Sequence, residues 1–223
     1  MKTGILFDLD GTLLDTLEDL TDSVNHTMEA FGCPTRTIEE IRRFVGDGAR
    51  NLIARALPGK ADDPDVDTVL AAYRAWYAEH SQIKTRPFDG ILEALEELKR
   101  DYPIAVVSNK SDSDVKALCR KYFGEEVFAL GEIADCPRKP APDMIYKGMA
   151  AIGATKCVYV GDSEVDVITA KNAGMPCLSV LWGFRDEELL RENGAEYLCR
   201  DPKDLAKTLK EMIEATPCHS NQA

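Results

Sequence analysis

The chain has 223 residues, of which 44% are hydrophobic and 30% charged, which suits a globular core with a small inserted module. Its formal net charge of −12 disfavours nucleic acids and anionic membranes as partners, because both bind basic surfaces. Seven cysteines without a Cys-x-x-Cys pair indicate reduced thiols in a cytoplasmic protein rather than zinc ligands or disulfides. The first apolar run is too short for a signal peptide, and no segment approaches the roughly 20 apolar residues of a membrane span, so we expect neither secretion nor membrane insertion.

Five short apolar runs alternate with helical patterns along the chain. Most of the runs are continuous rather than alternating in polarity, which is typical of strands buried on both faces of a parallel sheet. They span residues 4–7, 103–107, 127–130, 157–160 and 177–181. The repeat of strand and helix therefore predicts an α/β fold in which helices flank a parallel sheet.

About ninety residues separate the first two predicted strands, whereas a crossover connection needs only a dozen or so. Apolar residues recur there at helical spacing, which predicts four helices. Their apolar positions are Leu17, Leu20, Val24, Met28 and Phe31, then Ile38, Ile41 and Val45, then Leu52, Ile53, Ala56 and Leu57, and finally Val69, Ala72, Tyr73, Trp76 and Tyr77. We predict a helical cap over residues 16–86, inserted into a core made of residues 1–15 and 87–215. The polar tail, residues 216–223, is expected to be disordered.

Polar side chains follow four of the predicted strands, at the sheet edge where ligands bind in open parallel sheets. They are Asp8, Asp10 and Thr12 after the first strand, Ser108 and Asn109 after the second, Lys139 after the third, and Asp162, Ser163 and Asp166 after the fourth. Carboxylates, a hydroxyl, an amide and an ammonium gathered at one edge are the groups needed to hold Mg²⁺ and a phosphate together.

The residue types suggest a division of labour at this edge. Asp8 has a reference pKa of about 3.9, so it is ionised at neutral pH and able to attack phosphorus. Asp10 can protonate the leaving alkoxide and later activate water. Carboxylates of Asp8 and Asp162 can supply two of the oxygen ligands that Mg²⁺ requires. Lys139 can stabilise the transferring phosphoryl group, while the hydroxyl and amide after the second strand bind its oxygens.

Segments 8–12, 108–109, 139 and 161–166 resemble, in this order, the four motifs of the haloacid dehalogenase superfamily, and the resemblance covers nearly the whole chain. It implies a Rossmann-like fold with Asp8 as nucleophile and Asp10 as the acid–base residue. It also implies Mg²⁺ held by Asp8, the backbone carbonyl of Asp10 and Asp162, with Asp166 bound directly or through water. The residues assigned to phosphate are Gly11, Thr12, Ser108, Asn109 and Lys139. The alternative for Asp166 is an exposed acid favoured by a helix N-terminus.

Residues 44–53 resemble the cap signature of phosphoglycolate phosphatases, as do Asp19-Leu20, Val24-Asn25 and residues 181–184. Gly46 and Gly48 would let backbone amides approach a small anionic substrate. Arg50 could pair with the carboxylate of that substrate. The alternative is a glycine-rich turn that starts a helix, with Arg50 in solvent. The resemblance makes 2-phosphoglycolate the expected substrate.

Other activities remain open. A β-phosphoglucomutase shares the cap type and the stretch 139–143, and a 5′-nucleotidase or a pyrophosphatase differs mainly in cap contacts. A haloalkanoate dehalogenase needs neither Asp10 nor a metal, and a phosphonatase usually carries alanine there, so both are disfavoured. A signalling receiver or a phosphate sensor is the alternative outside enzymes, but a receiver has no helical insertion after its first strand.

We expect the protein to bind a small phosphorylated metabolite and to be a monomer or a homodimer.

Overall fold

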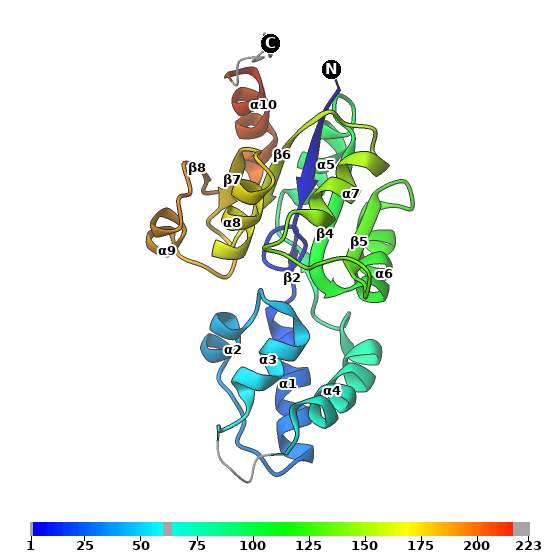
Figure 1. The fold of residues 1–223 in the computed structure, drawn as a ribbon, viewed down its shortest axis with the longest axis vertical. Helices are drawn as coiled ribbons and strands as arrows, with labels where there is room; N and C mark the ends of the chain where they lie inside the picture. The colour runs from blue at the N-terminus through cyan, green and yellow to red at the C-terminus, as the bar shows by residue number, and fades with distance from the viewer. Residues whose placement is uncertain (1, 60–63, 216–223) are drawn as a thin grey trace.

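The computed structural model describes residues 2–59 and 64–215, and within them a six-stranded parallel sheet forms the centre of the larger part of the molecule (Figure 1). The strand order is β5-β4-β1-β6-β7-β8, and every neighbouring pair is parallel. The strands are β1 (Thr3–Phe7), β4 (Ile104–Ser111), β5 (Phe128–Glu132), β6 (Lys156–Gly161), β7 (Cys177–Val180) and β8 (Tyr197–Cys199). The α/β fold predicted from the apolar runs is confirmed. Of the six strands in this sheet, only β8, a three-residue edge strand, was not predicted.

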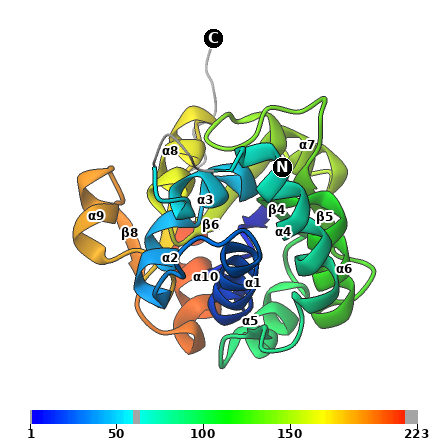
Figure 2. The ribbon, with the colours of Figure 1, turned by 90° about the horizontal axis from the view of Figure 1, so that it is seen from below.

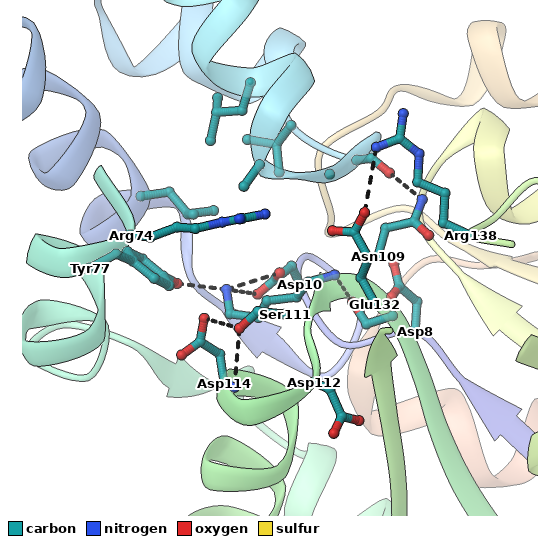
Figure 3. A pocket seen from close by; sticks show the side chains of 18 of the residues that line it. Asp8, Asp10, Arg74, Tyr77, Asn109, Ser111, Asp112, Asp114, Glu132 and Arg138 are labelled. Atoms are coloured by element: carbon teal, nitrogen blue, oxygen red, sulfur yellow. Dashed lines mark hydrogen bonds and ion pairs between the residues drawn. The ribbon is translucent and has the colours of Figure 1, made fainter. Parts of the chain in front are cut away.

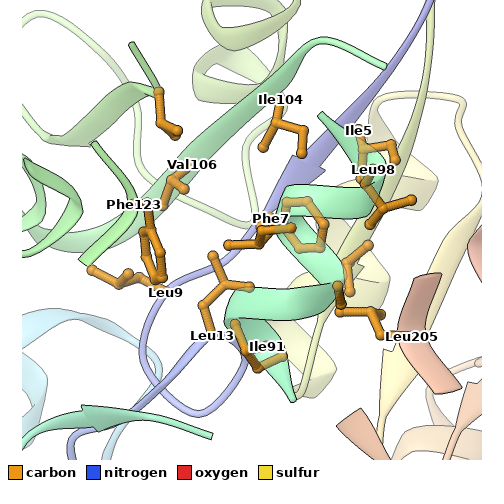
Figure 4. Close-up of a cluster of buried hydrophobic side chains, with 14 of the residues drawn as sticks. Ile5, Phe7, Leu9, Leu13, Ile91, Leu98, Ile104, Val106, Phe123 and Leu205 are labelled. Carbon is orange, nitrogen blue, oxygen red and sulfur yellow. The ribbon is translucent and has the colours of Figure 1, made fainter. Parts of the chain in front are cut away.

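Helices cover both faces of the sheet, which explains why its strands are apolar throughout. On β1, Ile5 and Phe7 pack into one buried cluster with helices α5 (Ile91–Leu98), α6 (Asp112–Phe123) and α10 (Leu205–Ala215) (Figure 4). The side chain between them, Leu6, packs on the opposite face against α7 (Asp143–Ala151) and α8 (Glu164–Asn172). The short helices α9 (Glu187–Glu192) and η1 (Pro202–Asp204) complete this part of the chain.

Four further helices fill the stretch for which a cap was predicted. They are α1 (Leu17–Ala30), α2 (Ile38–Phe44), α3 (Gly48–Ala56) and α4 (Val66–His80), and they enclose an apolar cluster of their own. A short antiparallel ladder, β2 (Leu14–Asp15) with β3 (Arg86–Pro87), holds the two connections side by side. A receiver has no such insertion, so the structure counts against that alternative. The exact domain boundaries remain a prediction, and the tail at 216–223 lies outside the described residues.

The four helices lie beyond the carboxyl ends of the strands, so they stand over the predicted site (Figures 1 and 2). Side chains from the sheet side bind the segment that ends α2 through its backbone carbonyls. Arg185 donates to the carbonyls of Arg42 and Val45, each at 2.7 Å, and Asn109 donates to that of Gly46 at 3.3 Å. Within residues 2–59 and 64–215, no helix is both long enough and apolar enough to cross a bilayer.

Candidate active site

A cavity of about 750 Å³ lies between the helical insertion and the carboxyl ends of β1, β4 and β6. Its floor is lined by Asp8, Asp10, Ser108, Asn109, Lys110 and Asp162, and its opposite side by Gly46, Gly48, Tyr73, Arg74 and Tyr77. The convergence of separate strand ends predicted from the sequence is therefore present. Figure 3 shows the labelled side chains extending into this space from both sides.

Lys139 is the buried cation beneath the cavity floor. Its Nζ atom lies 2.9 Å from Asp8 Oδ1, 2.8 Å from Asp166 Oδ1 and 2.9 Å from the hydroxyl oxygen of Tyr159. Two of the three ammonium hydrogens are donated to Asp166 and Tyr159. The contact with Asp8 is an ion pair without hydrogen-bond geometry, and Asp8 Oδ1 has no hydrogen-bond partner among the described residues. That oxygen is therefore available to a further electrophile or cation.

Asp162 lies at the end of β6 in contact with the loop that follows β1. Its Oδ1 atom accepts a hydrogen bond from the Thr12 hydroxyl at 2.9 Å, and its Oδ2 atom accepts one from the Phe184 amide at 2.7 Å. These bonds fix the orientation of the carboxylate while each oxygen keeps a second acceptor site. Asp162 is almost fully buried, as are Asp8 and Asp166.

Asp166 is completely buried, so the alternative of an exposed helix-terminal acid is wrong. It does stand in the first turn of α8, where it forms a capping box with Ser163. Its Oδ2 atom accepts hydrogen bonds from the Ser163 amide at 3.1 Å and the Ser163 hydroxyl at 2.6 Å. Its Oδ1 atom accepts from Lys139 and from the Tyr159 hydroxyl, the latter at 3.0 Å. Four hydrogen bonds occupy this carboxylate, and they orient Lys139.

Burial and mutual repulsion raise the pKa values of the acids in this group. Burial is the largest cause for Asp8, whose pKa rises to about 6 although Lys139 opposes the shift and Asp166 adds to it. Burial, followed by the charges of Asp166 and Asp8, raises the pKa of Asp162 to about 8. Burial alone would lower the pKa of Lys139, but Asp166 and Asp8 outweigh it and raise that pKa, so the lysine is charged. The site therefore concentrates negative charge that one ammonium does not balance.

The buried acids form a group with the spacing of a metal site. One carboxylate oxygen from each of Asp8, Asp162 and Asp166 lies within 4.8 Å of the others. Oxygen-only donors suit Mg²⁺, and a divalent cation would offset the repulsion that raises their pKa values. The residues present therefore fit the cofactor that the sequence predicts.

Ser108 and Asn109 were both predicted to bind phosphate with their side chains. Ser108 is buried at the cavity floor, and its hydroxyl is available because, within the described residues, it accepts only a long 3.4 Å hydrogen bond from the Lys110 amide. The Asn109 side chain is already engaged: Nδ2 donates to the carbonyls of Gly46 and Lys139, and Oδ1 accepts from the Lys139 amide at 2.9 Å. The Asn109 amide thus links the segments that contain Gly46 and Lys139, and it is not a free phosphate ligand.

Gly11 and Thr12 lie beside Asp162 rather than in the cavity lining. Gly11 adopts a φ of +81°, and a Cβ atom there would collide with the Asp162 carboxylate. The Gly11 and Thr12 amides bond to backbone carbonyls of their own turn. These residues shape the wall around Asp162, and their predicted direct contact with phosphate has no support in their position.

The structure places two of the three predicted cap residues in the cavity lining and the third outside it. Gly46 and Gly48 line the cavity with φ values of +112° and +79°, as a close backbone approach requires. Arg50 does not line it: its guanidinium pairs with Asp67 at 2.9 Å on the exposed surface. The proposed role of Arg50 in binding substrate is corrected for this reason. The helix α3 turns its side chain away from the cavity.

Several cavity residues were missed by sequence reasoning. Lys110 follows Ser108 and Asn109 directly, so its position on β4 was a usable signal. Tyr77 was assigned to packing, because its helical spacing places it on the apolar face of α4. Arg74 and Arg138 also line the cavity, from α4 and from the loop before Lys139 (Figure 3). No spacing rule separates these arginines from surface arginines.

A buried aspartate paired with a buried lysine, with further buried acids at neighbouring strand ends, gathers in one place the groups that a hydrolase needs. The family model described as haloacid dehalogenase-like hydrolase matches residues 5–180, and the chain belongs to this family. The resemblance predicted from the four motifs is confirmed.

Among curated proteins, a phosphoglycolate phosphatase of Mesorhizobium japonicum is 34% identical over 200 residues, which are 83% of this chain and 85% of that protein. Phosphoglycolate phosphatase 1 of Pseudomonas aeruginosa is 31% identical and covers 90% of this chain and 77% of its own length. A crystal structure of a protein from Lactobacillus delbrueckii subsp. bulgaricus has a TM-score of 0.84 at 36% identity, with 94% of this chain and 99% of that chain covered. CbbY from Rhodobacter sphaeroides, solved in complex with phosphate, has a TM-score of 0.75 at 28% identity and covers 94% of this chain and 100% of its own.

Proposed function

We propose that the protein is a Mg²⁺-dependent phosphomonoester hydrolase that forms an aspartyl phosphate on Asp8. The observation that carries this proposal is the buried Asp8 carboxylate at the cavity floor, 2.9 Å from Lys139 and grouped with Asp162 and Asp166. Such a group can attack phosphorus and stabilise the charge that develops during transfer. The names of the curated relatives support a phosphatase as the type of hydrolase.

The metal ligands proposed are Asp8, Asp162 and the backbone carbonyl of Asp10. Asp166 already accepts four hydrogen bonds, so we place it outside the direct ligands, where it orients Lys139. Bound Mg²⁺ would screen the repulsion between the Asp8 carboxylate and an anionic phosphate and polarise the phosphoryl oxygens.

The reaction has two steps. In the first, an Asp8 carboxylate oxygen forms a bond to phosphorus while the bond from phosphorus to the ester oxygen breaks, and Asp10 gives its proton to the departing alkoxide. In the second, Asp10 takes a proton from water as the water oxygen attacks phosphorus, and the bond to Asp8 breaks to release inorganic phosphate. Lys139 stays paired with Asp8 through both steps; it does not line the cavity, so its charge acts on the reacting carboxylate rather than by contact with phosphate.

The substrate proposed is 2-phosphoglycolate or a similarly small phosphorylated acid. Curated relatives from Mesorhizobium, Pseudomonas, Xanthomonas and Agrobacterium are named phosphoglycolate phosphatase, which is the basis for this choice. The cavity offers the positive charge that a substrate carboxylate needs, because Arg74 extends into it from α4 and forms no ion pair or hydrogen bond through its side chain with the described residues (Figure 3). Arg138 is only loosely paired, at 3.8 Å from Asp47 and 3.9 Å from Glu132. Arg74 therefore takes the role first expected of Arg50.

Hydrolysis assays test the reaction class first. Turnover of p-nitrophenyl phosphate should require Mg²⁺ and stop with a chelator. Asp8→Asn should abolish it, because an amide is a poor nucleophile. Asp10→Asn should slow turnover by roughly 10²–10⁴-fold yet retain Mg²⁺ binding, because the proposed ligand there is a backbone carbonyl. Full activity of the Asp8 variant would exclude the aspartyl phosphate.

A panel of phosphorylated metabolites tests the substrate separately. It should contain phosphoglycolate, β-glucose-1-phosphate, nucleoside monophosphates and pyrophosphate, so that the mutase-like, nucleotidase and pyrophosphatase alternatives are all represented. We expect the highest kcat/KM with phosphoglycolate. A clear preference for any other member would replace the substrate while leaving the phosphatase mechanism intact.

A further inference from the structure

The side chain of Lys110 joins the proposed acid–base residue to the helical insertion. Its Nζ atom lies 3.1 Å from each carboxylate oxygen of Asp10 and 2.6 Å from the hydroxyl oxygen of Tyr77 on α4. All three ammonium hydrogens therefore have acceptors. The side chains of Lys110 and Asp10 are 6% and 14% exposed, so water competes little for these contacts.

Both ends of this connection are held firmly. Lys110 belongs to β4, two residues beyond Ser108, so the sheet fixes its backbone. Tyr77 is buried in the apolar cluster of the insertion and stacks on Tyr73 with ring centroids 5.4 Å apart. Burial, followed by the charge of Asp10, raises the pKa of Tyr77 well above its usual value, so its oxygen remains a neutral phenol at neutral pH. The ammonium also lies 4.6 Å from the centroid of the Tyr77 ring.

Resting on the proposed function, we propose that Lys110 and Tyr77 are positioning residues that hold Asp10 in its proton-transfer orientation. Two equal contacts to one carboxylate restrict rotation of a side chain that would otherwise choose among several rotamers. Tyr77 restricts the ammonium in turn, and it does so only while α4 lies over β4. The acid–base residue is therefore aligned when the insertion covers the cavity.

Two other roles for Lys110 have different signatures. A lysine that bound the substrate directly would affect KM and would not depend on the Tyr77 hydroxyl. A lysine that merely held the insertion on the core would, when disturbed, slow all substrates equally. A positioning role predicts a loss that grows with the need for a proton on the leaving group.

Two aryl esters of similar size separate these cases. Phenyl phosphate releases a phenol about as basic as tyrosine, with a pKa of about 10, and this leaving group needs a proton. p-Nitrophenyl phosphate releases a much weaker base that departs with little assistance. Single-turnover measurement of phenol release reports the first step alone, so slow hydrolysis of the aspartyl phosphate does not mask the effect.

The test compares Tyr77→Phe, Lys110→Met and the wild-type protein, each with Mg²⁺ and both esters. Tyr77→Phe should slow release of phenol roughly tenfold and release of p-nitrophenol less than about twofold, since acid catalysis supplies 10²–10⁴-fold in total. Lys110→Met should show the same pattern with a larger loss from phenyl phosphate. Tyr146→Phe, the same change at an exposed residue of α7 outside the cavity, should leave both rates unchanged.

The outcomes separate this inference from the function on which it rests. Equal losses with the two esters, an effect confined to KM, or unchanged rates in Tyr77→Phe would each overturn the positioning role while leaving the phosphatase in place. Failure of the wild-type protein to hydrolyse either ester would instead overturn the proposed function, and the inference with it. Matching melting temperatures of Tyr77→Phe and wild type would show that the fold is preserved.

Discussion

Asp166 and Lys139 form a fully buried ion pair, with 2.8 Å between Oδ1 and Nζ, at the point where α8 begins. The same carboxylate closes the capping box with Ser163, so one side chain both starts a helix and orients the lysine that contacts Asp8. Stability and catalysis are therefore coupled at this residue. Removing one partner of a buried pair leaves the other charge without compensation.

Asp166→Asn should destabilise the protein by about 2–4 kcal/mol, because the amide supplies donors where the carboxylate accepts and leaves Lys139 with only Asp8 as a charged partner. Urea denaturation measures the change as a lower midpoint at an unchanged slope. Asp67→Asn, at an exposed acid paired with Arg50, is the control and should unfold near the wild-type midpoint. Similar midpoints for all three proteins would contradict the structural role of Asp166.

Arg74→Gln should lower kcat/KM for phosphoglycolate roughly 10–100-fold, because a charge-assisted hydrogen bond to the carboxylate contributes about 1.5–3 kcal/mol. Hydrolysis of 2-hydroxyethyl phosphate, which has a hydroxymethyl group in place of the carboxylate, should change little. The matched control is Arg50→Gln, since Arg50 pairs with Asp67 outside the cavity. Equal losses on the two esters would show that Arg74 does not recognise the carboxylate.

Gly11→Ala should abolish most activity, since the new Cβ atom would meet the Asp162 carboxylate in addition to the strain of a positive φ. Gly153→Ala is the matched control: its φ is +63°, and a Cβ atom there meets nothing within 4 Å. It should cost about 1–2 kcal/mol of stability from backbone strain and leave kcat unchanged. Comparable kcat values in the two variants would refute the steric role of Gly11.

Metal binding should depend strongly on pH. In the metal-free protein the pKa values of Asp8 and Asp162, about 6 and about 8, lie above the unfolded value of about 3.9. The folded state therefore binds protons more tightly, so these two groups stabilise it as pH falls from 8 towards 4 and lose that contribution as pH rises. Mg²⁺ requires the deprotonated acids, so its affinity should fall by up to about tenfold per pH unit from pH 8 to pH 6, and more steeply below pH 6, where both acids bind protons.

Melting temperatures measured with Mg²⁺ and with a chelator at pH 6 and pH 8 test this expectation. The increase on adding Mg²⁺ should be larger at pH 8, because ligand binding to the folded state alone raises its stability with affinity. Asp162→Asn should reduce the increase at both values of pH. An equal increase at pH 6 and pH 8 in the wild-type protein would mean that these acids do not bind the ion.

The fold could be predicted from the sequence because a strand that is buried on both faces is a continuous run of apolar residues. Ile5, Leu6 and Phe7 are all apolar since helices cover both sides of β1. The meeting of Asp8, Asp162 and Lys139 in one site could be predicted equally well, because the ends of parallel strands meet at one edge of the sheet. β8 was not predicted, since Tyr197, Leu198 and Cys199 are too few to show a pattern.

The contacts across the cavity were less predictable. Helical spacing placed Tyr77 on an apolar face, which is correct, but it gave no sign that the hydroxyl reaches Lys110. Arg50 and Arg74 differ only in the direction that their helices give them, and this direction depends on how α3 and α4 pack. Strand ends locate catalytic acids, whereas substrate-facing residues of an inserted unit depend on tertiary packing.

Arg185 and Asn109 hydrogen-bond to the end of α2 through backbone carbonyls, which belong to Arg42, Val45 and Gly46. Carbonyls at a helix C-terminus lack partners within the helix, and every residue type supplies one. Side chains of that segment can consequently change without loss of these backbone contacts. Substitution of the insertion's cavity-facing residues can thus change which phosphate ester is selected, while the backbone contacts made by Arg185 and Asn109 stay the same.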